Sequence, residues 1–460
     1  MKKTRIVSCV LVCILMIGTL SACAGSPGGE GAMTEGESAE ISGENASEGA
    51  GEAVSIMNLM AADLLSPGEE GENPATQNAA KGANDFAFKM SALLAEDAGD
   101  ENMVCSPFSV WLPLAALLNA TDEANKPALI SALGASDIRV EDINMAASRM
   151  LYDLTKLRIA EHMDDYNDPM KIANAIFVGD TVTLNKDFAQ TFLDYYRGTA
   201  MTVDFSSSDA VDKVNQWASD NTEGLITDLI QEFDPDTIAA IANAIYYSDR
   251  WMQEFDPDET TEGDFEGTTG TTTAEFMIRE GLAPGYFEDD QIQAMPLSFA
   301  SGGGLYIILP KDKDANACLS KLDAAYFDEI QTNSMQATGK FMLPRFTIQS
   351  GVMDLSGTLT KLGVPLLDRE KAPLSGYLIE EDIPVWVGQA VQKAMIEVNE
   401  KGTTAAAVTV MGINTTSLPM PTAPFEMICD RPFVFVLYDN TFDGGKQVLF
   451  TGIVNQIAVG

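Results

Sequence analysis

The most unusual stretch of this sequence reads Glu400-Lys401-Gly402-Thr403-Thr404-Ala405-Ala406-Ala407-Val408-Thr409-Val410. It follows an apolar run at residues 394–398, and no charge or proline occurs from Gly402 to Ser417. Its β-branched residues favour a strand, while its small side chains allow it to lie exposed without a core of its own. An exposed, uncharged strand former is ordinarily an aggregation hazard. We therefore interpret insertion into a β-sheet as the purpose of this segment.

The patterns on either side of this stretch predict an α+β fold. Helical periodicity occurs first, at residues 84–96, 106–118 and 210–231. Most of the strand-like runs come later, at residues 171–178, 238–247, 293–299, 305–309, 340–348, 390–398, 433–438 and 448–454. Because strands and helices do not alternate along the chain, a doubly wound parallel sheet is excluded.

The first 53 residues read as an export signal and a tether. A basic start (Lys2, Lys3, Arg5) precedes an apolar run at residues 6–20, which is too short for a comfortable membrane span. The following Leu20-Ser21-Ala22-Cys23 resembles the lipobox of bacterial lipoproteins. We expect residues 1–22 to be a signal peptide, Cys23 to carry the lipid, and residues 23–53, rich in Gly, Ser, Ala and Glu, to be a flexible acidic tether. This places the body, residues 54–460, outside the cell and attached to the membrane only through the lipid.

The composition excludes several classes of function. The formal net charge is −40, and such a surface repels phosphate backbones, so we expect no nucleic-acid partner. The charge keeps the protein soluble, and two interpretations stay open: that it serves solubility alone, or that it also favours encounter with basic partners. Beyond the export signal and Cys23, only Cys105, Cys318 and Cys429 remain, far apart and odd in number. They predict neither a disulfide framework nor a zinc site.

Catalytic chemistry is not evident either. His162 is the single histidine, in the acidic stretch His162-Met163-Asp164-Asp165, and no Gly-x-Ser-x-Gly elbow accompanies it. We interpret His162 as a solvated loop residue. The sequence predicts no enzyme, no metal site and no cofactor.

Residues 400–407 resemble the hinge and reactive-centre loop of inhibitory serpins, which begins Glu-x-Gly-Thr-x-Ala-Ala-Ala. The resemblance covers nearly the whole body, from about residue 54 to residue 455. Each motif alone is weak evidence for the family, but their occurrence in the same order is strong evidence. The other matching segments are Ile172–Phe177, Val211–Leu229, Asn243–Tyr247 with Trp251, Phe255–Pro257, Asp430–Phe433 and Phe450–Asn455.

This resemblance implies a monomeric serpin fold of three β-sheets and about nine helices, with a reactive-centre loop at about residues 400–429. A serine protease would cleave the loop and form an acyl-enzyme, and the cut loop would then insert into the large sheet as an extra strand and trap the protease. The alternative is a non-inhibitory serpin that acts as a binding module or as a simple protease substrate.

The resemblance also implies roles for particular residues. The hinge comprises Glu400, Gly402, Thr403, Ala405, Ala406 and Ala407. The breach, where insertion starts, comprises Trp251, Arg345 and Glu400, with Arg345 in place of the more common Lys. The shutter comprises Ser106, Ser109, Asn243 and Gln392. Two residues depart from the family pattern: Gln392 replaces a common His, and Val408 is bulkier than usual.

In the family, the residue before the reactive bond is usually the seventeenth when the hinge Glu is counted as the first. Counted from Glu400, this resemblance places the reactive bond at Thr416-Ser417. The loop is several residues longer than usual, so Met411, Leu418 and Met420 are alternative cleavage residues. A small residue before the bond fits shallow specificity pockets, as in elastase-like or subtilisin-like enzymes. No Lys or Arg lies between Lys401 and Arg431, which disfavours a trypsin-like target.

Overall fold

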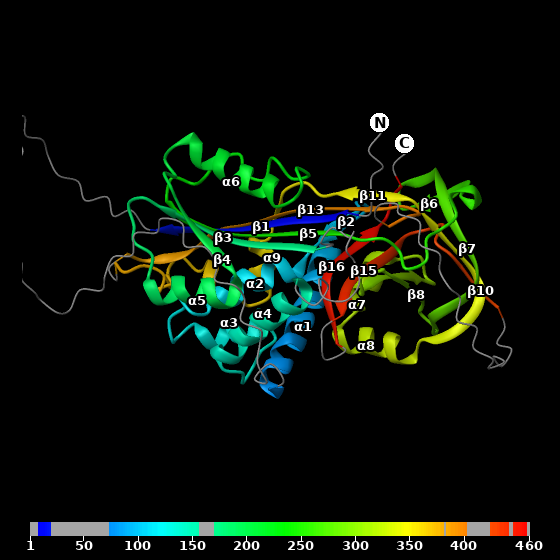
Figure 1. The fold of residues 1–460 in the computed structure, drawn as a ribbon, viewed down its shortest axis with the longest axis horizontal. Helices are drawn as coiled ribbons and strands as arrows, with labels where there is room; N and C mark the ends of the chain where they lie inside the picture. Colours follow the sequence, from blue (N-terminus) through cyan, green and yellow to red (C-terminus); the bar gives the residue numbers. More distant parts are fainter. Residues whose placement is uncertain are drawn as a thin grey trace, which may run out of the picture.

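The computed structural model describes residues 8–19, 73–155, 170–380, 383–402, 424–440 and 445–457. In these ranges helices and sheets are both extensive, which confirms the α+β prediction (Figure 1). The helices are α1 (Pro74–Ala98), α2 (Pro107–Leu117), α3 (Lys126–Ala132), α4 (Val140–Thr155), α5 (Lys186–Tyr196), α6 (Ser208–Asp220), α7 (Ala315–Lys321), α8 (Ala324–Asn333) and α9 (Ser356–Lys361), with 3-10 turns η2 (Pro257–Glu259) and η3 (Pro365–Leu367).

One sheet has seven strands and runs along the long axis of the molecule (Figure 1). In spatial order these are β11 (Phe346–Gln349), β13 (Val385–Val398), β1 (Ser8–Thr19), β5 (Thr237–Ser248), β3 (Met170–Gly179) and β4 (Gly198–Val203), and β12 (Met353–Asp354) also pairs with β13. Helix α6 covers one face of this sheet, and α2 lies on the opposite side (Figure 1).

The other sheet has nine strands. In spatial order they are β14 (Phe425–Ile428), β10 (Met335–Pro344), β7 (Gly270–Glu288), β8 (Ile292–Ser298), β9 (Gly304–Pro310), β15 (Phe433–Asn440), β16 (Lys446–Val454) and β2 (Met103–Cys105), with β6 (Thr261–Gly267) on the side of β7. Three separate sheets were predicted, whereas the described strands form two. The reason is the length of β7: its first part pairs with β10 and β6, and its last two residues pair with β8.

Four predicted elements differ in extent. The helix expected over residues 210–231 ends at Asp220, because Glu223 and Gly224 adopt positive φ angles of 52° and 76° that a helix cannot continue through. The strand expected over residues 340–348 divides at Arg345 into β10 and β11, which belong to different sheets. The helix expected over residues 84–96 begins earlier, as α1 at Pro74, and the strand expected over residues 390–398 begins earlier, as β13 at Val385. The remaining predicted helices and strands lie close to the expected residues.

Strand β1 comes from the apolar run near the N-terminus. It lies between β5 and β13, antiparallel to both, with eleven residue pairs on each side. Its described side chains, Cys13 to Met16, are buried: Cys13 and Leu15 in the main core with α2, Ile14 and Met16 in the cluster beneath α6. The structure describes the uncleaved chain, and removal of residues 1–22 on export stays a prediction.

Candidate functional site

The end of β13 carries an ion pair between a buried carboxylate and a partly exposed guanidinium. Glu400 is 5% exposed, and its Oε1 lies 2.5 Å from Nη2 of Arg345, which also donates from Nε at 2.7 Å. Thr260 donates its hydroxyl to the same carboxylate oxygen at 2.6 Å, and Arg345 forms a second ion pair with Glu275 of β7. The division between β10 and β11 therefore places Arg345 where it links the two sheets to the last residues of β13.

Trp251 completes this cluster. Its indole N–H donates to the carbonyl of Asn399 at 2.8 Å, its backbone N–H donates to the carbonyl of Lys401, and its ring stacks on Phe299 with centroids 4.8 Å apart. Gly402 lies directly against it: a Cβ there would come within 2.3 Å of the Trp251 backbone nitrogen, and φ is +67°. Only glycine fits, so the chain leaves β13 through one defined conformation.

The pKa of Glu400 lies below its ordinary value of 4.5. Burial, the largest single influence, raises this pKa, but the hydrogen bonds from Arg345 and Thr260 and the charge of the guanidinium together outweigh it. The carboxylate is therefore ionised throughout the neutral range and keeps the end of β13 attached to Arg345.

We predict that Glu400→Gln lowers the free energy of unfolding at pH 7 by about 1–3 kcal/mol, since it removes charge-assisted hydrogen bonds from a buried site. Because the folded pKa is lowered, this contribution is present above the unfolded pKa of about 4.5 and is lost as the pH falls through the folded value. Urea unfolding at pH 7, 5 and 3.5 measures it, with the exposed Glu262→Gln as control. A deficit that stays constant down to pH 3.5 contradicts the assignment to ionisation.

The shutter residues gather beneath the middle of the seven-stranded sheet. The side chain of Gln392 donates to the carbonyl of Ser106 at 3.0 Å and accepts from its N–H at 3.1 Å. The Ser106 hydroxyl caps the start of α2 by accepting from the N–H of Ser109. Gln392 therefore attaches β13 to the first turn of α2 through two buried hydrogen bonds.

Asn243 belongs to the same row of the sheet. Gln392, Cys13, Asn243 and Asn174 face one another in register across β13, β1, β5 and β3, and Asn243 donates to the Asn174 side chain at 2.8 Å. Within the described residues, the Asn243 side-chain oxygen and the Ser109 hydroxyl are buried without a hydrogen-bond partner. Strand β1 separates Asn243 from Gln392, so these two residues would become direct neighbours if β5 and β13 paired with each other.

Several predicted residues lie outside the described ranges. These are Cys23, His162, the hinge residues Thr403, Ala405, Ala406 and Ala407, the bulky Val408, the bond Thr416-Ser417, and the alternatives Met411, Leu418 and Met420. The structure does bring together the three breach residues, and it places the four shutter residues around the start of α2 and the sheet above it.

Sequence reasoning missed some of the partners. Thr260, Glu275 and Phe299 complete the breach, and Lys393 of β13 forms a half-buried ion pair with Asp228 beside α6 at 2.6 Å. Thr260 lies just after the Phe255–Pro257 motif, which is the only signal that points to it. The others are single residues in ordinary strand or loop patterns, so only the folded geometry identifies them.

The described residues carry no cluster of three or more His, Cys, Asp or Glu side chains that could hold a metal ion. Cys13, Cys105, Cys318 and Cys429 are free thiols. None of the described helices is long and apolar enough to cross a membrane.

The fold combines a seven-stranded and a nine-stranded sheet with helices on both faces of the first. Residues 81–457 match the family model Serpin (serine protease inhibitor), and the chain belongs to the serpin family. Serpins are generally protease inhibitors rather than enzymes.

Individual relatives share this architecture over most of their length. The chain is 31% identical over 394 residues to plasminogen activator inhibitor 1 of Sus scrofa (82% of this chain, 92% of the relative). It is 26% identical over 388 residues to alpha-1-antitrypsin-like protein GS55-MS of Ictidomys tridecemlineatus (83% and 90%). Among solved structures, the thermophilic serpin Tengpin in its native state is similar with a TM-score of 0.68 at 23% identity (82% and 94%), which shows the fold.

Proposed function

We propose that this chain is a suicide-substrate inhibitor of serine proteases, in which residues 403–416 insert between β5 and β13 after cleavage. The observation that carries the proposal is the strand position itself. Between β5 and β13 the sheet accommodates a whole twelve-residue strand, paired on both edges. Residues 403–416 comprise about 14 residues and reach roughly 46 Å at about 3.3 Å each, so they are long enough to replace β1.

The direction of the strand supports the same conclusion. β1 runs antiparallel to β13. A segment that leaves the end of β13 and folds back also runs antiparallel to it, and Gly402 has the positive φ that such a reversal favours. Export cleavage after residue 22 would remove β1, and the position between β5 and β13 would then be free for the reactive loop.

The residue types in the loop suit this position. The described side chains of β1, Cys13 to Met16, are buried on both faces of the sheet, toward α2 and toward α6. Small and β-branched side chains, such as those of residues 403–410, can enter both faces without overpacking them. A charged side chain would be buried without a partner at a cost of several kcal/mol.

We infer that the reactive bond is Thr416-Ser417 and that the target enzymes are elastase-like or subtilisin-like. The uncharged loop supports enzymes with shallow, apolar specificity pockets. Incubation with pancreatic elastase should yield a denaturant-resistant covalent band at the summed mass of the two proteins, and trypsin should yield none. Clean cleavage with no adduct for elastase and subtilisin would favour the non-inhibitory alternative.

We further propose that the mature protein begins at a lipidated Cys23 and is displayed on the outer side of the cell membrane. The apolar run before Leu20-Ser21-Ala22-Cys23 and the acidic tether after it support this location. In cells fed radiolabelled palmitate, the protein should take up label, and Cys23→Ser should abolish it, whereas Cys318→Ser should not. Equal labelling of both variants would contradict the assignment of Cys23.

A further inference from the structure

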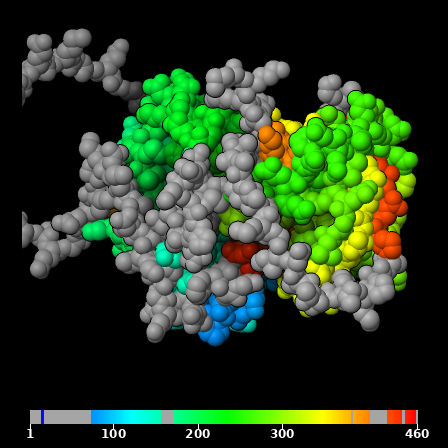
Figure 2. Space-filling model, turned by 45° about the vertical axis from the view of Figure 1, so that its right-hand side comes forward, coloured from blue at the N-terminus to red at the C-terminus, as the bar shows by residue number. Residues whose placement is uncertain are grey.

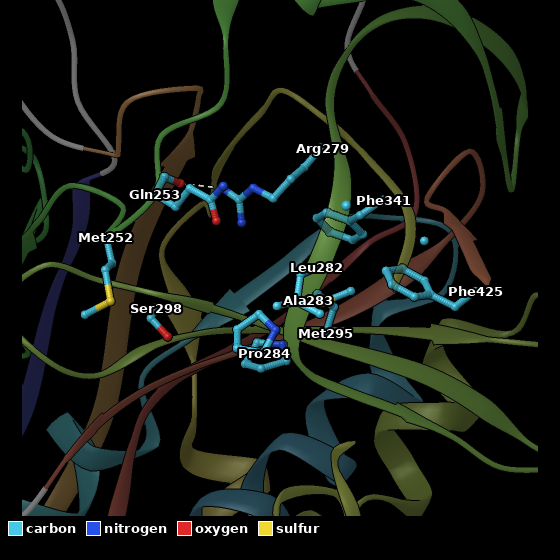
Figure 3. Close-up of a pocket in the computed structure, with 13 residues that line it drawn as sticks. Met252, Gln253, Arg279, Leu282, Ala283, Pro284, Met295, Ser298, Phe341 and Phe425 are labelled. Carbon is cyan, nitrogen blue, oxygen red and sulfur yellow. Dashed lines mark hydrogen bonds between the residues drawn. The ribbon is translucent and has the colours of Figure 1, made fainter. Parts of the chain in front are cut away.

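A pocket of about 450 Å³ opens in the nine-stranded sheet, away from the strand position between β5 and β13. Its walls come from β7, β8, β10, the start of β14 and the segment after Trp251 (Figure 3). In Figure 2, β7, β10 and β14 follow one another in green, yellow and orange-red on the right of the molecule. This volume lies within the range of small-molecule sites, which is roughly 300–1,000 Å³.

Most of the lining is apolar. Phe341 and Phe425 form one side of the pocket, and Pro284, Leu282 and Met295 form its base in the view of Figure 3. Leu282 is 53% exposed, and Met252 at the opposite side is 62% exposed. A single exposed apolar side chain needs no explanation, but two on the rim of one cavity mark a surface that favours an apolar ligand.

One cation lies among these apolar side chains. The guanidinium of Arg279 lies over the Phe255 ring, 4.1 Å from the ring centroid. It donates to the backbone carbonyl of Gln253 (Figure 3). Within the described residues its Nε is buried without a hydrogen-bond partner, and no carboxylate forms an ion pair with it. Burial lowers the pKa of Arg279 to about 10, so the group is still charged at neutral pH.

A half-buried cation without a counter-ion is electrostatically unsatisfied, and an anion that entered the pocket would satisfy it. The neighbouring acidic residue of β7, Glu280, lies on the other face of the strand beside Lys340. The pocket therefore combines one positive charge with an apolar interior.

We propose that this pocket binds a small amphiphile that carries a single carboxylate on an apolar body. The carboxylate would lie against Arg279, and the body would pack against Phe341, Phe425 and Leu282. The proposal does not depend on protease inhibition, since none of these residues belongs to the hinge, the breach or the shutter.

Titration calorimetry of the full chain with decanoate, and with uncharged decanol, tests the proposal. We expect decanoate to bind one site per chain. Arg279→Gln should raise the dissociation constant of decanoate at least about tenfold, and should change that of decanol less than about twofold. Lys340→Gln is the matched control: it removes a positive charge from β10 on the face away from the pocket and should leave decanoate binding unchanged.

Arg279 packs on Phe255, so its replacement could disturb the fold, and a second variant avoids that ambiguity. Leu282 is mostly exposed, and Leu282→Asp should also weaken decanoate at least about tenfold, because it places a negative charge at the pocket. No saturable binding at sub-millimolar decanoate, or equal binding by wild type, Arg279→Gln and Leu282→Asp, would overturn the proposal. So would an equal loss in Lys340→Gln, which would assign binding to net charge alone.

Discussion

Thr403→Arg should convert the protein from an inhibitor into a substrate, raising the number of molecules consumed per inactivated protease roughly tenfold or more. Thr403 is the first residue after Gly402, so it enters the sheet first in the proposed insertion. The described side chains between β5 and β13 are at most 4% exposed, and a guanidinium there would be buried without a counter-ion. A barrier higher by 1.4 kcal/mol slows insertion about tenfold, and deacylation then releases the protease.

Titration of elastase with increasing amounts of each variant measures this stoichiometry. Thr422→Arg is the matched control, because Thr422 follows every candidate cleavage residue and does not belong to the inserted segment. It should keep the wild-type stoichiometry. Unchanged trapping by Thr403→Arg, or an equal loss in both variants, would show that insertion does not begin at this residue.

Repeating patterns predicted most of the fold. The strands β3, β5, β13, β15 and β16 lie where apolar runs of strand length predict them, because a strand buried on both faces needs such a run. The predicted end of α6 at residue 231 was wrong. Residues 221–231 keep apolar side chains at helical spacing, but the positive φ angles of Glu223 and Gly224 turn the backbone out of the helix. The backbone conformation of these two residues sets where the helical segment stops, and the pattern of apolar side chains does not predict that conformation.

The first apolar run shows where composition is ambiguous. Residues 6–20 have the length and polarity of a signal sequence, and the same properties suit a strand buried on both faces, as the described side chains Cys13 to Met16 of β1 are in the uncleaved chain. Periodicity alone cannot separate these interpretations, because neither has a polar face.

The site was predictable to the extent that it follows motifs. Glu400, Arg345 and Trp251 meet as the family resemblance implies, because each lies at the end of a strand that the fold brings to one place. Gln392 bonds to the Ser106 backbone, whereas its relation to Asn243 depends on what lies between β5 and β13. Whether Asn243 and Gln392 are neighbours depends on whether a strand lies between β5 and β13, and no residue pattern predicts this.

Cleavage of the reactive loop should raise the melting temperature of the chain that begins at residue 23 by about 10 °C or more. The inserted loop would gain a ladder of backbone hydrogen bonds with β5 and with β13, each worth about 0.5–1.5 kcal/mol net, and would bury its side chains on both faces. A change of 1 kcal/mol shifts the melting temperature of a domain of 150–250 residues by about 2–4 °C, and proportionally less for a body of about 400 residues. A rise of 10 °C therefore corresponds to roughly 5–10 kcal/mol. Circular dichroism measures it before and after a nick in the loop by thermolysin, a zinc protease that forms no acyl-enzyme and so cannot be trapped.

The chain that retains residues 1–22 provides the control that isolates the strand position. There β1 already pairs with β5 and β13 along eleven residues each, so the cut loop finds the position occupied. Nicking this form should shift the melting temperature by less than about 2 °C, because no new ladder forms. An equal rise in both forms would mean that the gain arises elsewhere in the molecule, and no rise in either would show that the cut loop does not enter the sheet.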